Sequence, residues 1–130
     1  MRNIVIDTNI LISALITPNG KPAQIIELID NIDIKVVCNE KILDEYREVL
    51  SRPKFDFSID EQKSIVEDIS SFATHHNPTA SNIPLPDEKD RIFYDTAKSS
   101  GAILITGNMK HYPEESFIMT PAGFINLFKP

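Results

Sequence analysis

The chain has 130 residues, of which 42% are hydrophobic and 25% are charged, and this composition excludes an intrinsically disordered protein. Its formal net charge of −6 argues against a protein that holds nucleic acid by bulk electrostatic attraction, because that attraction comes from Lys and Arg side chains that neutralise phosphates. No apolar run reaches membrane-spanning length and no secretory signal is recognisable, so we expect one cytoplasmic domain over residues 1–130.

The first predicted element is a short buried strand that ends at an acid. Residues 4–6 are β-branched and apolar, which favours a strand, and residues 10–16 are nearly all apolar again. Asp7, Thr8 and Asn9 therefore lie between two buried elements. A buried charge is costly unless it is paired or binds a metal. Two interpretations are open: Asp7 or Thr8 caps the helix that follows, or Asp7 belongs to a functional site.

Helices and strands alternate along the rest of the chain. Apolar periodicity, turn residues and capping patterns predict helices at about residues 23–32, 40–50, 59–73, 87–100 and 121–128, and strands at 34–38, 102–106 and 116–120. Asn39 is one expected N-cap, and Ser58 with Glu61 forms an expected capping box. His75 and His76 fall in a connection, where we expect a structural role. The alternation predicts an α/β fold, a three-layer α/β/α sandwich with a mostly parallel central sheet.

Acids can gather at the carboxyl ends of the strands, where open sheets of this kind bind ligands. Asp7 directly follows the first strand. At about 100° per residue, Glu45 lies nearer to the apolar stripe of its helix than the other three acids of that helix, and Asp90 lies nearer to the stripe of the later helix than Asp95. Simpler explanations stay open for both. Glu45 can be a solvated glutamate, and Asp87 can be an N-cap with Asp90 in the first turn, where the helix dipole favours negative charge.

Three carboxylates at one edge of a sheet need a cation. Asp7, Glu45 and Asp90 would repel one another and raise one another's pKa values unless a positive charge compensates them. Oxygen ligands without Cys or His favour Mg²⁺ or Mn²⁺ over zinc. Such an ion can lower the pKa of a bound water and stabilise the charge that develops on a phosphate. The predicted reaction class is therefore metal-assisted hydrolysis of a phosphodiester.

Three segments of the chain together resemble the PIN-domain nucleases, in particular the PIN-family toxin components of bacterial toxin–antitoxin systems. The segments are IVIDTNILISALI, ILDEYREVLSRPKF and DEKDRIFYDTAKSSGAILITGNMKHYP, and they occur in the family's order over nearly the whole chain. The resemblance implies a PIN-like fold and a Mg²⁺- or Mn²⁺-dependent endoribonuclease that hydrolyses RNA. It also implies an antitoxin protein as a partner and a homodimer.

The resemblance also assigns roles to particular residues. The family's catalytic, metal-binding acids match Asp7, Glu45 and Asp90, and Asn108 stands where many members have a fourth acid. An amide brings no charge, so we expect one metal ion, or a second one completed only by substrate phosphate. The remaining expected site residues are the supporting Asn9, Thr106 and Asp87, and, as cations or hydrogen-bond donors that can contact RNA phosphates, Lys110, His111 and Arg91.

Two other classes of protein share some features with this chain. A phosphotransfer receiver domain needs paired acids after the first strand and an acceptor after a central strand, but here the central strand ends at Cys38 and Asn39. Cys38 is expected to be a buried core residue. A non-catalytic binding module with the same fold would explain Asn108, but not the three retained acids.

Overall fold

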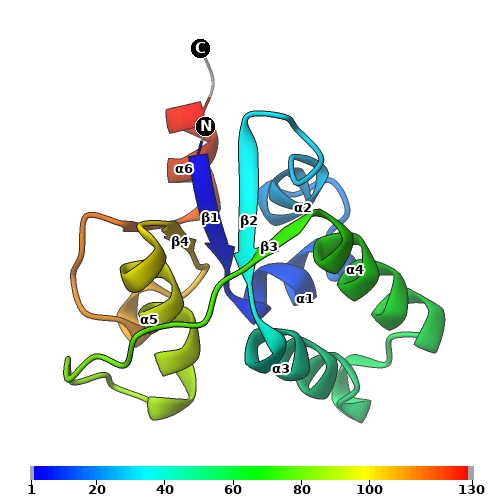
Figure 1. Cartoon of the computed structure of the whole chain (residues 1–130). Helices are drawn as coiled ribbons and strands as arrows, with labels where there is room; N and C mark the ends of the chain where they lie inside the picture. Colours follow the sequence, from blue (N-terminus) through cyan, green and yellow to red (C-terminus); the bar gives the residue numbers. More distant parts are fainter. Residues whose placement is uncertain (1, 129–130) are drawn as a thin grey trace.

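The computed structural model describes residues 2–128, which form a five-stranded sheet flanked by helices (Figure 1). The strands are β1 (Arg2–Ile6), β2 (Ile34–Cys38), β3 (Ala73–His75), β4 (Ile103–Ile105) and β5 (Ile118–Met119). The α-helices are α1 (Thr8–Ile16), α2 (Lys21–Glu27), α3 (Glu40–Leu50), α4 (Ile59–Phe72), α5 (Arg91–Ser100) and α6 (Pro121–Phe128). Three short 3₁₀ turns connect them: η1 (Pro53–Phe55), η2 (Glu88–Asp90) and η3 (Met109–His111).

All strand pairs of the sheet are parallel, and the strand order is β3-β2-β1-β4-β5. The predicted α/β fold is therefore confirmed, with a sheet that is wholly rather than mostly parallel. The connection from β1 to β2 and the connection from β3 to β4 run in opposite directions along the sheet. Because such crossovers are right-handed, they place α1 and α2 on one face and α5 on the other.

The strand order reverses at β1, which lies between β2 and β4. The chain runs outward from β1 to β3 and then returns to the other side of β1 to form β4. In open parallel sheets, ligands bind in the crevice beyond the carboxyl ends of the strands at such a reversal. Asp7 directly follows β1, and its backbone N–H donates to the carbonyl of Ile105 at the end of β4 over 3.0 Å.

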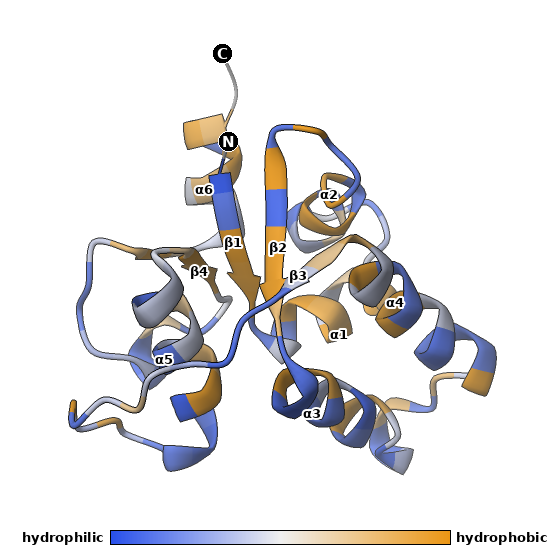
Figure 2. Cartoon of the chain, in the orientation of Figure 1, coloured by the Kyte–Doolittle hydropathy of each residue, from blue (hydrophilic) through white to orange (hydrophobic). Residues whose placement is uncertain are grey.

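The apolar pattern of the sequence accounts for the central strands and the surrounding helices. Ile4, Val5 and Ile6 are completely buried, as a strand covered on both faces requires. In Figure 2 the carboxyl-terminal parts of β1 and β2 have the colour of hydrophobic residues, whereas hydrophilic residues are spread over α3. The two predicted N-terminal caps are present: Asn39 accepts from the N–H of Ile42 (3.0 Å), and the complete capping box begins α4.

Some element boundaries differ from those predicted. α4 ends at Phe72, which is half exposed, and Ala73–His75 form the edge strand β3 instead of continuing the helix into a connection. A three-residue strand is too short to give a periodic sequence signal. α2 ends at Glu27, before the predicted 32, and the later helix begins with η2 before α5. None of the helices in the described residues has the length and apolar character to cross a membrane.

Candidate functional site

Asp7 lies at the reversal of the sheet and does not cap the helix that it precedes. It occupies the N-cap position of α1, but its side chain makes no capping hydrogen bond. Instead its Oδ2 accepts hydrogen bonds from Thr106 Oγ1 (2.8 Å), Tyr112 OH (2.9 Å) and Asn9 Nδ2 (3.1 Å). All three of these bonds end on one oxygen, which leaves Oδ1 for another partner. Thr8, the other predicted cap, has a buried Oγ1 without a hydrogen-bond partner.

The environment of Asp7 opposes its negative charge. The residue is 5% exposed, and burial raises the pKa of its carboxyl above the usual value, although the hydrogen bonds from Thr106 and Tyr112 lower it. Three donors around one oxygen also fix the orientation of the carboxylate. A buried, oriented acid whose charge is only partly compensated is a suitable ligand for a cation.

Hydrogen bonds of the Asn9 side chain join the segment after β4 to the segment after β1. Asn9 Nδ2 also donates to Thr106 Oγ1 (3.3 Å), and its Oδ1 accepts from the N–H of Gly107 (2.9 Å). A side chain at Gly107 would crowd this contact, because an added Cβ would lie 3.2 Å from Asn9 Oδ1. Thr106 Oγ1 in turn accepts from the N–H of Asn108 (3.0 Å). The structure therefore brings Asn9, Thr106 and Asn108 to Asp7.

Glu45 is the most buried acid of α3. Glu40, Asp44 and Glu48 are exposed, whereas Glu45 is partly buried, as its direction around the helix predicted. Burial raises the pKa of its carboxyl, the neighbouring Glu48 adds to this, and the charge of Asp7 also contributes. Glu45 and Asp7 thus lie within electrostatic reach of each other.

Asp90 completes a group of three acids. It is the last residue of η2 and makes no capping hydrogen bond to α5, while Asp87 caps η2 by accepting from the N–H of Lys89 (2.9 Å). The capping explanation therefore holds for Asp87 but not for Asp90. Burial, together with the charges of Asp7, Asp87 and Glu45, raises the pKa of Asp90 to about 6 against the opposing effect of His111.

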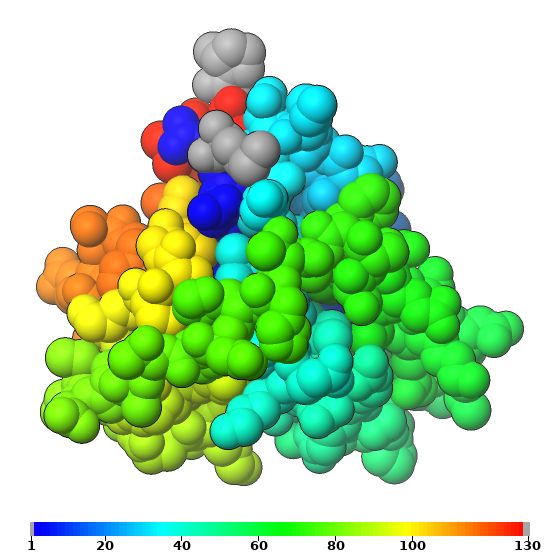
Figure 3. Space-filling view, viewed as in Figure 1, coloured from blue at the N-terminus to red at the C-terminus, as the bar shows by residue number. Residues whose placement is uncertain are grey.

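Asp95 is more deeply buried than the direction around its helix predicted. It is 4% exposed, whereas the side chain of Asp90 is 17% exposed. The connection between β3 and η2 crosses the front of the molecule (Figure 3) and covers this face of α5. Asp95 accepts hydrogen bonds from Ser81 Oγ (2.5 Å) and from the N–H of Ser81 (3.2 Å). The sequence could not predict this cover, because it comes from tertiary packing.

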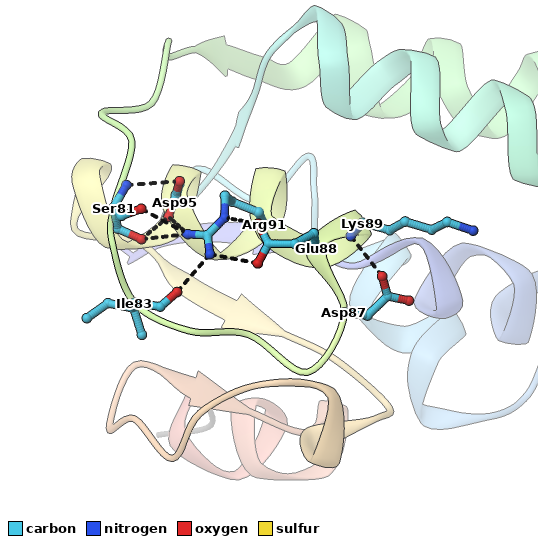
Figure 4. A network of polar contacts seen from close by, with 7 residues as sticks. All are labelled: Ser81, Ile83, Asp87, Glu88, Lys89, Arg91 and Asp95. Atoms are coloured by element: carbon cyan, nitrogen blue, oxygen red, sulfur yellow. Dashed lines mark hydrogen bonds and ion pairs between the residues drawn. The ribbon is translucent and has the colours of Figure 1, made fainter.

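Arg91, one of the residues expected to contact RNA, is fully engaged within the protein (Figure 4). Its Nε and Nη2 donate to the carboxylate of Glu88 (2.6 and 2.8 Å), and Nη2 also donates to the carbonyl of Ile83 (2.7 Å). Its Nη1 donates to the carbonyl and hydroxyl oxygens of Ser81 (3.1 and 3.0 Å). Since a guanidinium has five N–H donors, none is left for a phosphate while this loop is in place.

The turn η3 brings His111 and Tyr112 into the candidate site. His111 Nε2 lies 2.9 Å from Asn108 Nδ2, and its Nδ1 lies 3.4 Å from Asp90 Oδ2. Lys110 and His111 are both exposed. His111 contacts Asp90, whereas within residues 2–128 Lys110 forms no ion pair with an acid of the site. Tyr112, which the sequence analysis missed, is 5% exposed and donates to Asp7. The available signal was that a buried tyrosine hydroxyl needs a partner.

The carboxylate oxygens of the candidate site are of the kind that binds divalent cations. In residues 2–128 no group of three or more His, Cys, Asp or Glu side chains is already arranged to hold a metal ion. However, the buried Asp90 Oδ2 makes no hydrogen bond, and the second oxygen of Asp7 is not used by the three donors that hold the first. Carboxylate oxygens of this kind suit Mg²⁺ or Mn²⁺. An orphaned buried oxygen within a group of mutually repelling acids is what such an ion would satisfy.

Comparison with known proteins gives a match over most of the chain. Residues 3–110 match the family described as PIN domain. The chain is also similar to an uncharacterized protein of Methanocaldococcus jannaschii, with 35% identity over 108 residues that cover 81% of this chain and 70% of that protein. The matched part includes β1, α3, η2 and β4, and therefore all the acids discussed above.

Proposed function

The chain belongs to the PIN-domain family, a nuclease-like family, and from this premise we propose that it is a divalent-metal-dependent endoribonuclease that hydrolyses RNA phosphodiester bonds. We propose further that it is the toxin of a toxin–antitoxin pair. The observation that carries the first proposal is the group formed by Asp7, Glu45 and Asp90 at the reversal of the sheet. Each has a raised pKa, and Asp90 has a buried oxygen without a hydrogen bond.

Asp7 and Asp90 are the proposed metal ligands, with Glu45 as the third acid. When bound, a Mg²⁺ or Mn²⁺ ion would supply charge stabilisation at the phosphate and a bound water of lowered pKa. Asn9, Thr106 and Tyr112 hold Asp7 by one oxygen and so present the other. This arrangement supports a carboxylate that binds through Oδ1 and cannot rotate away.

A single strong metal position fits the residues better than two. Asn108 faces His111 through its amide group, and it brings no negative charge. Affinity for divalent cations rises with the number of charged ligands. A second ion would therefore depend on the substrate phosphate for part of its coordination. The exposed Lys110 and His111 are the proposed phosphate contacts beside this position. Arg91 is not a proposed phosphate contact, because hydrogen bonds within the protein occupy its N–H donors.

Cleavage of labelled RNA by the purified chain tests the proposed activity. Single-stranded and structured RNAs are incubated with Mn²⁺, with Mg²⁺ and with EDTA, beside Asp90→Asn and Glu45→Gln variants. Glu40→Gln is the matched control, because Glu40 is an exposed acid of the same helix as Glu45. We expect metal-dependent cleavage that both site variants lose and the control keeps. No cleavage with either ion would leave a PIN-domain protein that binds without catalysis.

A toxin role implies an antitoxin partner, and one surface supports such a partner. A groove of about 500 Å³ lies between α1, α2 and α4, with Leu15, Ile26 and Ile65 among its apolar residues. Its lining also includes the acids Glu27, Asp60, Glu61 and Asp68. An amphipathic segment with basic residues complements both features. The toxin role predicts growth arrest when the chain is expressed alone and none for Asp90→Asn, and the proposed homodimer is checked by sedimentation.

A further inference from the structure

The turn that follows α3 carries a stacked pair of aromatic rings. We call residues 52–57, with the sequence RPKFDF, the aromatic turn. The rings of Phe55 and Phe57 are nearly parallel, with 5.7 Å between centroids and 9° between planes. The ammonium group of Lys54 lies 5.1 Å from the centroid of Phe55. Two aromatic rings and a cation in one short surface turn are the components of single-strand nucleic acid sites.

The backbone of the aromatic turn changes direction at Asp56, which ends η1 in the left-handed conformation. Asp56 has φ of 54°, and it is the one residue other than glycine with positive φ in residues 2–128. Phe57 packs against the hydrophobic core, whereas Phe55 stacks on Phe57 and stays outside that core. Asp adopts this conformation more readily than most residues, and here it lies between the two rings. The turn therefore leaves Phe55 partly exposed beside Phe57.

The aromatic turn begins two residues after the end of α3, the helix that carries Glu45. Glu45 and Glu48 lie three residues apart on one side of α3, and Arg52, which follows the helix, reaches back to Glu48. Arg52 binds both carboxylate oxygens of Glu48 (2.9 and 3.3 Å), and its charge acts on Glu45, whose pKa it lowers against the effect of burial. From Glu45 to the last residue of α3, Leu50, the helix rises about 8 Å. A strand of RNA that passes Glu45 can therefore reach the aromatic turn within a few nucleotides.

We propose that the aromatic turn is a stacking platform for an unpaired base of the RNA substrate, with Phe55 as the ring that the base covers. This inference rests on the proposed function for its ligand class. The net charge of −6 means that bulk attraction cannot hold RNA on this protein, so affinity must come from local contacts. Stacking on a ring is such a contact, and it requires a base that is not paired. The ammonium of Lys54, which lies over the ring of Phe55 in the free protein, gives way to the base and contacts the phosphate of the same nucleotide.

Substitution of Phe55 tests the platform directly. The chain contains no tryptophan, so Phe55→Trp introduces a single fluorophore at the proposed stacking position. In EDTA, we expect single-stranded RNA to quench its fluorescence and a duplex of the same sequence not to do so. Phe55→Leu keeps an apolar side chain but removes the ring, and we expect it to weaken single-stranded RNA binding roughly 5- to 100-fold. Phe72, half exposed at the end of α4, provides the matched control substitutions Phe72→Trp and Phe72→Leu.

The outcomes separate the platform from the proposed catalysis. An unchanged dissociation constant for Phe55→Leu, or equal quenching of Trp at positions 55 and 72, would overturn the platform even if the protein cleaves RNA. Conversely, loss of binding in Phe55→Leu together with an inactive wild-type protein would keep the platform and reject the nuclease. Circular dichroism and urea unfolding of both Leu variants check that the comparison is between folded proteins. A shallow dependence of binding on salt is expected in addition, because stacking releases few counterions.

Discussion

The hydroxyl of Tyr112 donates a 2.9 Å hydrogen bond to Asp7 Oδ2, across 105 positions of the sequence. Tyr112 directly follows η3, the turn that carries His111, and Asp7 follows β1. This bond therefore holds the segment after β4 against the segment after β1. It also supplies one of the three donors that orient the central acid of the candidate site.

The Tyr112→Phe substitution removes this donor and keeps the ring. Because a hydrogen bond to a buried carboxylate is lost while the packing stays, we expect the free energy of unfolding at pH 7 to fall by about 1 to 3 kcal/mol. Urea denaturation in EDTA measures it. Unchanged stability would mean that the bond contributes nothing to holding Asp7.

Asp90 should make the metal-free protein dependent on pH in a defined window. Its pKa is raised from 3.8 to about 6 in the folded state. The folded state therefore binds more protons than the unfolded state between about pH 4 and pH 6, so the Asp90 contribution to stability declines as the pH rises through this range. Above pH 6 the ionised Asp90 destabilises the metal-free fold.

Asp90→Asn removes the destabilisation that the ionised Asp90 carboxylate causes. We expect the variant to be roughly 1 to 2 kcal/mol more stable than the wild type at pH 7 in EDTA, with the difference vanishing near pH 4. Urea titrations at the two pH values measure it. A variant that is less stable than the wild type at pH 7 would show that Asp90 is held by a favourable interaction instead of a strained one.

Arg91 should matter for stability far more than an exposed arginine. Arg91→Ala leaves the buried Asp95 without a nearby cation (3.6 Å) and releases the carbonyls of Ser81 and Ile83, so we expect a loss of about 2 to 4 kcal/mol. Arg47→Ala breaks only an exposed pair with Asp44 and should cost about 1 kcal/mol or less. Thermal unfolding of both variants gives the comparison. Equal losses would argue against a structural role of the loop network.

Asn108→Asp should strengthen the second metal position. The substitution adds a fourth carboxylate to the group, which raises the charge available to a second ion. We expect Mn²⁺ titration calorimetry to change from one ion to two ions per chain, and the metal-free variant to be less stable than the wild type because like charges are added. An unchanged stoichiometry would show that Asn108 does not face the ion.

The sequence predicted best where local pattern and packing agree. The apolar stripe of α3 packs against α1, α4 and α5, so the direction of Glu45 around that helix predicted its burial correctly. The same test failed for Asp95, because the connection after β3 covers a side of α5 that the helical pattern assigns to solvent. The residue pattern within one helix cannot predict that a connection from elsewhere in the chain will pack over that helix.

Contacts between distant residues were beyond the sequence for the same reason. The strand β3 has only three residues and exists through its pairing with β2. Tyr112 belongs to the candidate site through its bond to Asp7, and nothing near Tyr112 in the chain indicates that partner. Arg91 was expected at the RNA, but its neighbours in space occupy all its donors.

We propose that Asp7, Glu45 and Asp90 together form one site for a divalent cation. Mn²⁺ titration followed by electron paramagnetic resonance tests this without depending on an RNA substrate, on the wild type, Asp90→Asn and the exposed control Glu40→Gln. We predict one tightly bound Mn²⁺ per wild-type chain, affinity reduced roughly tenfold or more in Asp90→Asn, and no change in the control. Absence of Mn²⁺ binding to the wild type, or equal binding to Asp90→Asn, would contradict the claim.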